Sequence, residues 1–142
     1  MKVRKLVAAA AIIVALGTPV FAHQEVSAED YDAAMKTIRS TQQGVNDHLE
    51  AQSTADLGAD GAKLVEAFGK TEAFWKARGV DEAATLAGTA LAAAQKFQEA
   101  GAAGNFEAAG AAFGEMRETC RPCHTTYRQR NEDGSFSIKQ GS

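Results

Sequence analysis

The chain is predicted to be an all-α protein, an antiparallel up-down-up-down four-helix bundle. Apolar residues recur at spacings of three and four in four separate segments, and alanine is abundant while β-branched residues are sparse. After the first 22 residues, no stretch alternates with the period of two that is typical of a strand. Short connections make sequential helices antiparallel neighbours, which gives the up-down-up-down order.

The first 22 residues are interpreted as a secretory signal peptide. Three basic residues precede the apolar run 6–17, which is too short to span a membrane, and small residues follow it. We expect cleavage after Ala22, with Ala28 as the second choice. The mature protein would then be periplasmic and would have no membrane span.

The mature part, residues 23–142, is expected to be acidic. The whole chain has 15 basic and 18 acidic residues, and the leader removes three basic residues and no acidic one, which leaves a net charge of −6. This charge argues against nucleic acid as a partner and weakly favours a basic partner protein. Residues 23–130 are expected to form one helical domain, and the polar tail 131–142 is expected to be extended.

The first helix is expected to begin at the N-cap Ser27, with acidic residues in its first turn, and to end near Ser53. Its inner stripe is Met35, Ile38, Gln42, Val45 and Leu49. A loop of about six residues that contains Gly58 and Gly61 is expected to follow, because loops of this length commonly join helices in bundles.

The second helix is predicted from the stripe Leu64, Phe68, Thr71 and Trp75, and Gly79 is expected to end it. Asp81 is expected to cap the third helix, and Gly101 and Gly104 to end it. The inner stripe of this third helix is Ala83, Leu86, Ala90, Ala94 and Phe97.

The fourth helix is expected to begin after the cap Asn105. Its inner positions step by three and four without a slip, so both cysteines of the chain fall on the core-facing seam. The seam is Phe106, Ala109, Phe113, Met116, Cys120, Cys123 and Tyr127. Pro122 lacks a backbone N–H and crowds the preceding turn, so a kink or a restarted turn is expected there.

The run Cys120-Arg121-Pro122-Cys123-His124 is the pattern for covalent attachment of one c-type haem. Two thiols must reach the two vinyl groups of a porphyrin, and an imidazole must ligate the iron from the same side. Positions i, i+3 and i+4 of a helix share a face and can present all three groups towards the bundle interior. A redox disulfide would need a strand-and-helix context that is missing, and a zinc site would need a fourth ligand. Attachment would require haem attachment machinery outside the cytoplasm.

This haem motif, continued to Tyr127-Arg128 in the last of four helices, resembles the cytochrome c′ family, including its low-spin cytochrome c-556 branch. The resemblance implies that Cys120 and Cys123 form thioethers and that His124 is the proximal iron ligand. It also implies that Arg128 lies near the haem propionates. Met35 matches the distal position of the first helix, which is a methionine ligand in the c-556 branch.

The chain departs from the family pattern at three places. Tyr31-Asp32 stands where a basic pair often precedes the distal residue, the loop between the second and third helices is short, and Pro122 is unusual within the motif. Members of the family often dimerise through their first two helices, so a homodimer is a possible state. No surface stripe of this sequence demands one.

Met35 is a candidate for the sixth iron ligand on geometric grounds as well. It lies about seven residues from the start of its helix, and His124 lies about six residues from the end of its own. At ~1.5 Å per residue, both are roughly 9 to 11 Å from the same end of an antiparallel bundle. The alternative is that Met35 is a core methionine that touches the distal face without bonding.

Two function classes follow from these alternatives. With both axial positions filled, the protein is an electron carrier that is not an enzyme and serves redox partner proteins that the sequence does not identify. With Met35 only lining the distal pocket, the protein is a five-coordinate binder of nitric oxide or carbon monoxide. A peroxidase is not supported, because no distal histidine or acid–base pair is in place.

Overall fold

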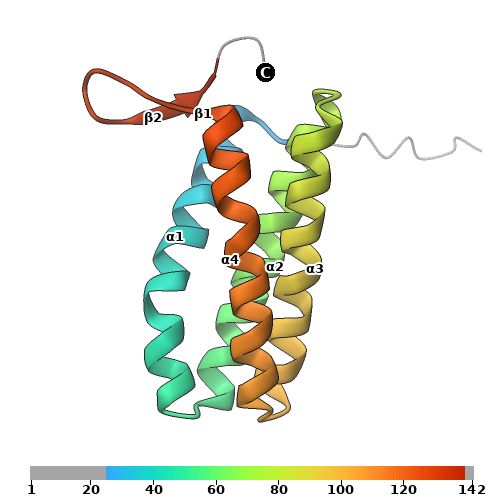
Figure 1. Cartoon of the computed structure of the whole chain (residues 1–142), viewed down its shortest axis with the longest axis vertical. Coiled ribbons are helices and arrows are strands. Elements are labelled where there is room, and N and C mark those ends of the chain that lie inside the picture. The colour runs from blue at the N-terminus through green and yellow to red at the C-terminus, as the bar shows by residue number, and fades with distance from the viewer. Residues whose placement is uncertain (1–24, 140–142) are drawn as a thin grey trace, which may run out of the picture.

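The computed structural model describes residues 25–139 and confirms the antiparallel four-helix bundle (Figure 1). Its helices are α1 (Ala28–Glu50), α2 (Thr54–Ala77), α3 (Asp81–Ala102) and α4 (Phe106–Tyr127). Two short strands follow, β1 (Arg128–Arg130) and β2 (Phe136–Ile138). The predicted signal peptide lies outside the described residues. No helix in residues 25–139 is long and apolar enough to cross a membrane.

The connection between α1 and α2 is shorter than expected. Gly58 and Gly61 lie inside α2, not in a loop, because Ser53 already caps that helix by accepting a hydrogen bond from the backbone N–H of Asp56. The glycines allow α2 and α3 to approach closely. A Cβ atom at Gly61 would lie 2.5 Å from the Cβ atom of Gln98, and one at Gly101 would lie 2.8 Å from Leu57 Cβ.

The ends of α3 match the sequence analysis only in part. Asp81 is the first helical residue rather than the cap, which is Val80 without a side-chain hydrogen bond. Gly79 and Gly104 have positive φ angles of 69° and 75°, as expected of glycines that end helices. Gly101 stays inside α3, where it faces Leu57.

The fourth helix begins as predicted, since Asn105 accepts a hydrogen bond from the N–H of Ala108. The helix is not restarted at Pro122 but runs unbroken through it to Tyr127. Pro122 and Glu118 are both exposed, so solvent can hydrate the carbonyl that loses its partner.

The C-terminal segment is a hairpin rather than an extended tail, and the helical part ends at Tyr127, three residues earlier than expected. Arg128 pairs with Ile138 and Arg130 pairs with Phe136 in antiparallel register. Gly134 has a φ angle of 83° in the turn, where Asp133 accepts hydrogen bonds from Ser135. Three-residue polar strands are too short for their alternation to be read from sequence.

Buried residues form two clusters along the bundle. The larger one fills the middle and the end where α2 begins, and it includes Leu57, Leu64, Phe97 and Met116. The smaller one lies where α4 ends and consists of Phe74, Trp75, Ala83, Ala84, Ala87 and Tyr127, with Tyr31, Cys123 and Ile138 packed against it. Helices that follow each other in sequence pack extensively, whereas α1 and α4 make few contacts.

Candidate haem-attachment site

The last two turns of α4 carry Cys120, Cys123 and His124, all half-buried. The fully buried Met116 precedes them on α4 and the buried Tyr127 follows them, so the helix is anchored in the core on both sides of the motif. The thiol of Cys120 donates a long hydrogen bond to the carbonyl oxygen of Met116 (3.7 Å), and neither cysteine forms a disulfide. The predicted seam therefore holds, and the three groups share one side of the helix as the motif requires.

Both thiols are neutral near pH 7. Burial, the charge of Cys120 and that of Glu82 raise the pKa of Cys123 to about 11. Burial also raises the pKa of Cys120, against smaller opposing effects of Gln42 and Thr119. Reactive cysteines of redox disulfides have lowered pKa values, so the surroundings of this pair do not fit that chemistry.

His124 is in the form that binds metal. Burial lowers the pKa of its imidazole, and the positive charge of Arg128 lowers it further. A neutral imidazole can offer a ring nitrogen lone pair to iron. His124 directly follows Cys123 on α4, so its imidazole is placed to ligate the iron of a porphyrin attached to the two thiols.

The face of α1 opposite this motif carries Tyr31, Met35, Ile38 and Gln42, spaced like one stripe of a helix. Tyr31 lies near Cys123, whose charge contributes to raising the tyrosine pKa, and Gln42 lies near Cys120. Met35 is partly buried between them on the same helix. Sequence reasoning listed Gln42 only as an inner position and Tyr31 only as a departure from the family, and it missed that both lie beside the cysteines.

The axial offset between Met35 and His124 is small. Met35 is seven residues from the first residue of α1, and His124 is three residues from the last residue of α4. At ~1.5 Å per residue, their backbones differ in level by roughly 6 Å. Helical side chains lean towards the N-terminus of their own helix, so in antiparallel helices these two side chains lean towards each other.

An aromatic group lies beside the motif. Tyr31 stacks on Phe74 with ring centroids 4.3 Å apart, and Trp75 meets the rings of Phe74 and Tyr127 at 5.2 Å each. Burial is the main cause that raises the pKa of Tyr31 to about 12. Trp75 belongs to the stripe that predicted the second helix, and its ring is fully buried.

The residues around the motif fit a porphyrin. The buried Nε1 of Trp75 and Nε2 of Gln42 make no hydrogen bond of standard geometry, and each lies beside a polar atom of the site, the hydroxyl of Tyr31 and the thiol of Cys120 respectively. Both donors therefore lie within reach of a polar group held beside the cysteines. Small residues of α3, Ala83, Ala84 and Ala87, line the same end, and α1 and α4 are loosely packed. A flat, largely apolar group with polar substituents matches this lining.

Arg128 lies at the boundary of the site. It is the C-cap of α4, where its backbone N–H donates to the carbonyl oxygen of His124. Its exposed guanidinium lies 4.1 Å from the ring centre of Phe136 in the hairpin. The structure therefore places Arg128 near His124 with its side chain at the solvent edge, and its place beside the haem propionates stays a prediction.

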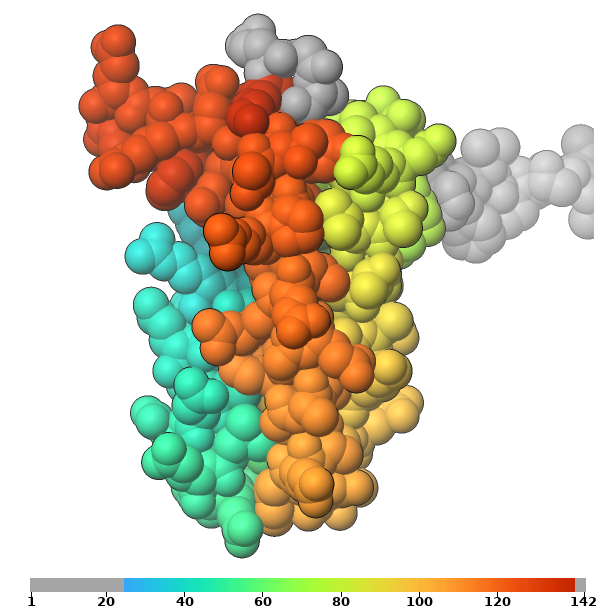
Figure 2. All heavy atoms as spheres, viewed as in Figure 1, coloured from blue at the N-terminus to red at the C-terminus, as the bar shows by residue number. Residues whose placement is uncertain are grey.

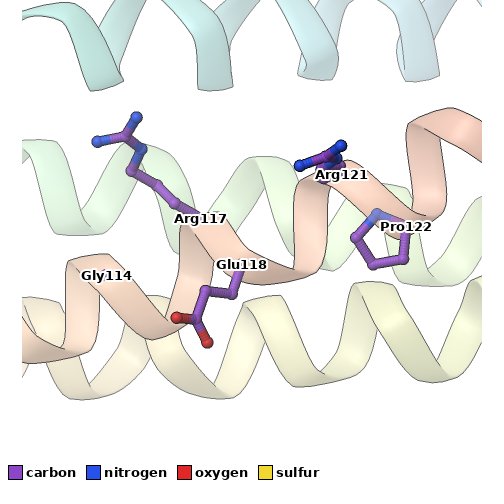
Figure 3. A pocket seen from close by; sticks show the side chains of 5 residues that line it. All are labelled: Gly114, Arg117, Glu118, Arg121 and Pro122. Carbon is purple, nitrogen blue, oxygen red and sulfur yellow. The ribbon is translucent and has the colours of Figure 1, made fainter.

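A hollow on the surface of α4 is lined by Gly114, Arg117, Glu118, Arg121 and Pro122 (Figure 3). Arg117 points towards α1, Arg121 lies on the side of α4 nearer α1, and Glu118 points towards α3. All the lining comes from one helix, so the hollow is an open depression and not an enclosed cofactor cavity.

Comparison with known proteins gives the same assignment as the site. The chain matches no curated protein and no solved structure. The protein-family model described as Cytochrome C′ matches residues 13–128, which include the haem motif and all four helices. The chain therefore belongs to the cytochrome c′ family, whose members carry covalently bound haem c.

Proposed function

We propose that this protein is a periplasmic electron carrier with one haem, and not an enzyme. In this proposal Cys120 and Cys123 hold the haem by thioether bonds, His124 is the proximal ligand and Met35 is the distal ligand. The observation that carries it is the place of Met35 on α1, between the two residues that lie beside the cysteines. A thioether and an imidazole on facing helices can grip an iron from both sides.

The haem, when bound, supplies a reversible one-electron change between ferric and ferrous iron. The chain orients the group through Cys120, Cys123 and His124. The aromatic group around Trp75 limits access of water, which helps to tune the potential. The side chains of Trp75 and Gln42 lie beside Tyr31 and Cys120 and can contact the group inside the bundle, and Arg128 is available to a propionate at the solvent edge.

Gas binding is the second candidate. It is favoured by the contact of Met35 with the larger apolar cluster, because a methionine engaged in core packing can leave the iron five-coordinate. Nitric oxide or carbon monoxide would then enter an apolar distal pocket. The two candidates differ in whether the Met35 sulfur bonds to iron.

The deciding experiment is Met35→Leu in the haem-loaded protein, with Met116→Leu as the matched control. Both changes nearly conserve volume, and Met116 is a fully buried methionine on the helix that bears the haem motif. Electron transfer predicts a low-spin wild type that does not bind carbon monoxide when reduced. It also predicts a high-spin, carbon monoxide-binding Met35→Leu protein and an unchanged control. A high-spin wild type that binds carbon monoxide would support the gas-binding candidate.

Export is the part of the proposal that depends on the leader. The basic residues and apolar run at the N-terminus support secretion to the periplasm, where haem attachment machinery would act on the two thiols. N-terminal sequencing of the secreted protein should begin at His23. A protein that keeps its leader and is found in the cytoplasm would contradict this assignment.

A further inference from the structure

Lysines and arginines in the described part of the chain differ in whether they form ion pairs with carboxylates. Five lysines form ion pairs with carboxylates, and these are Lys36, Lys63, Lys70, Lys76 and Lys96. No arginine in residues 25–139 has a carboxylate within 4.0 Å. Four of these six arginines, at 117, 121, 128 and 130, are the ones closest in sequence to the haem motif.

Charge is segregated along the chain in the same way. Residues 25–116 contain fifteen acidic and seven basic residues, whereas residues 117–139 contain four arginines, one lysine and three acidic residues. The acidic neighbours do not neutralise these arginines. Glu118 points towards α3, Asp32 is paired with Lys36, and Asp133 bonds within its own turn. A positive region therefore lies next to the haem motif on a protein of negative net charge.

The four arginines lie on one side of the molecule. Arg117 projects from α4 towards α1, and Arg121 lies on the side of α4 nearer α1 (Figure 3). The hairpin projects beyond the helices on that same side (Figures 1 and 2). Arg128 and Arg130 share one face of β1 with their register partners Ile138 and Phe136. On this face Ile138 packs on the buried cluster, whereas Arg128, Arg130 and Phe136 are exposed to solvent.

The hairpin adds an aromatic group to the arginines. Phe136 is the large hydrophobic residue most exposed in the described part of the chain, at 49%, and it lies under the guanidinium of Arg128. Arginine and aromatic side chains are enriched at the centres of protein interfaces. The family match ends at residue 128, so residues 129–139 are a feature of this chain beyond the matched family region.

We propose that Arg117, Arg121, Arg130 and Phe136 form an arginine–hairpin surface beside Arg128 that docks an acidic redox protein. Unpaired guanidinium groups bind carboxylates in two-point geometry, and an acidic partner would supply them. The proposal rests on the proposed electron-carrier function. One electron passes between the two proteins, with no bond made or broken and no proton transferred. Net charge alone favoured a basic partner, whereas the charge beside the haem motif favours an acidic one.

The first test uses small oxidants of opposite charge on the reduced, haem-loaded protein. The net charge of −6 predicts that oxidation by anionic hexacyanoferrate(III) becomes faster as salt is added. The arginine–hairpin surface predicts that it becomes slower, because salt screens a local attraction. Cationic tris(phenanthroline)cobalt(III) should show the opposite trend. A hexacyanoferrate rate that rises with salt would overturn the proposal.

Charge reversal locates the effect. Arg121→Glu/Arg130→Glu should lower the hexacyanoferrate rate about tenfold at low ionic strength, because two reversed charges lie near the site of electron exit. The control Lys70→Glu/Lys96→Glu changes the net charge equally at paired positions outside the arginine–hairpin surface and should lower the rate less than the arginine variant does. Arg121→Gln/Arg130→Gln should give an intermediate rate. Equal effects of the two charge reversals would contradict a local surface.

A second test identifies the class of partner. Poly-L-glutamate added to the isotope-labelled protein should shift backbone amide signals of residues 117–139 and should do so less in the Arg121→Glu/Arg130→Glu variant. Binding only to phosphatidylglycerol–phosphatidylcholine vesicles would assign the surface to a membrane and reject a protein partner. Self-association seen by sedimentation and lost in the variant would assign it to a second copy. Hexacyanoferrate oxidises five- and six-coordinate haem alike, so a high-spin spectrum would reject the proposed function without changing the salt test.

Discussion

The two ends of the bundle differ in how completely the side chains of the protein fill the core. At the end where α1 meets α2, Leu57 and Phe97 are fully buried, and the Nδ1 atom of His48 lies 2.6 Å from the Oδ2 atom of Asp60. At the end that carries the haem motif, Cys120, Cys123 and His124 are only half-buried, and α1 and α4 make few contacts along their length. The core at the first end consists of protein side chains alone. The core at the second end is completed by the covalently bound haem that members of the family carry.

The largest expected effect comes from removing the attachment points. Cys120→Ala/Cys123→Ala should release the haem under denaturing conditions, because no thioether remains. Loss of the porphyrin leaves a void whose cost grows by about 24 cal/mol per Å³. Hydrogen exchange should therefore accelerate at the start of α1 and the end of α4, while amides around Leu57 and Phe97 stay protected.

Mass spectrometry and hydrogen exchange of the wild type and this variant check both statements. The wild type should keep one haem mass after denaturation without sensitivity to reductant. A Cys120–Cys123 disulfide in the exported wild type would contradict attachment. Exchange that accelerates equally at both ends would contradict the contrast between them.

Two phenylalanine truncations compare the self-sufficient end with the hairpin. Phe97 is fully buried with its ring centre 5.7 Å from that of Phe113, so Phe97→Ala should lower the free energy of unfolding by about 3 to 5 kcal/mol. Phe136 is half exposed, so Phe136→Ala should cost less than about 0.5 kcal/mol. Denaturant unfolding of the two variants measures both values, and similar costs would show that the hairpin is part of the core.

Glycines in α2 allow a smaller and more local comparison. Gly61→Ala should destabilise the protein by about 1 to 3 kcal/mol, because the new Cβ atom would lie 2.6 Å from the backbone Cα atom of Gln98. Gly69 has nothing within 4 Å of a Cβ position, so Gly69→Ala should stabilise the helix by up to about 1 kcal/mol. Thermal unfolding should move the two midpoints in opposite directions. Equal shifts would mean that the α2–α3 approach is not tight at Gly61.

The same contrast explains what could be predicted from sequence. Periodicity found the four helices, and the cysteine spacing found the haem motif, because each is a local pattern. Gly58 and Gly61 were read as a loop because sequence shows a glycine's freedom but not the neighbour that requires its small size. Only the position of Gln98 on α3 reveals why Gly61 is helical.

The site shows the same limit. Counting residues placed Met35 and His124 near the same end of the bundle, and the earlier end of α4 at Tyr127 shifts their levels apart by roughly 6 Å. Tyr31 and Gln42 are part of the site because they lie beside Cys123 and Cys120 on another helix. No local sequence pattern predicts such a contact between two helices. The arginine–hairpin surface was missed because the unpaired state of its arginines depends on where every carboxylate lies. A net charge averages over that arrangement.

The smallest predicted effect tests whether alkaline pH weakens the haem end first. A tyrosine is charged only when deprotonated, and burial raises the pKa of Tyr31 from 10.0 to about 12. Above pH 10 the unfolded chain therefore loses this proton before the folded protein does. The contribution of protonated Tyr31 to the free energy of unfolding is complete below pH 10. This contribution falls by on the order of 2 kcal/mol as the pH rises to 12. Tyr31→Phe has no such proton, so the difference in unfolding free energy between wild type and variant should shrink or change sign across this window. Hydrogen exchange at pH 11 should show the start of α1 opening before the region around Phe97, and a difference that is constant from pH 9 to 12 would contradict the burial of Tyr31.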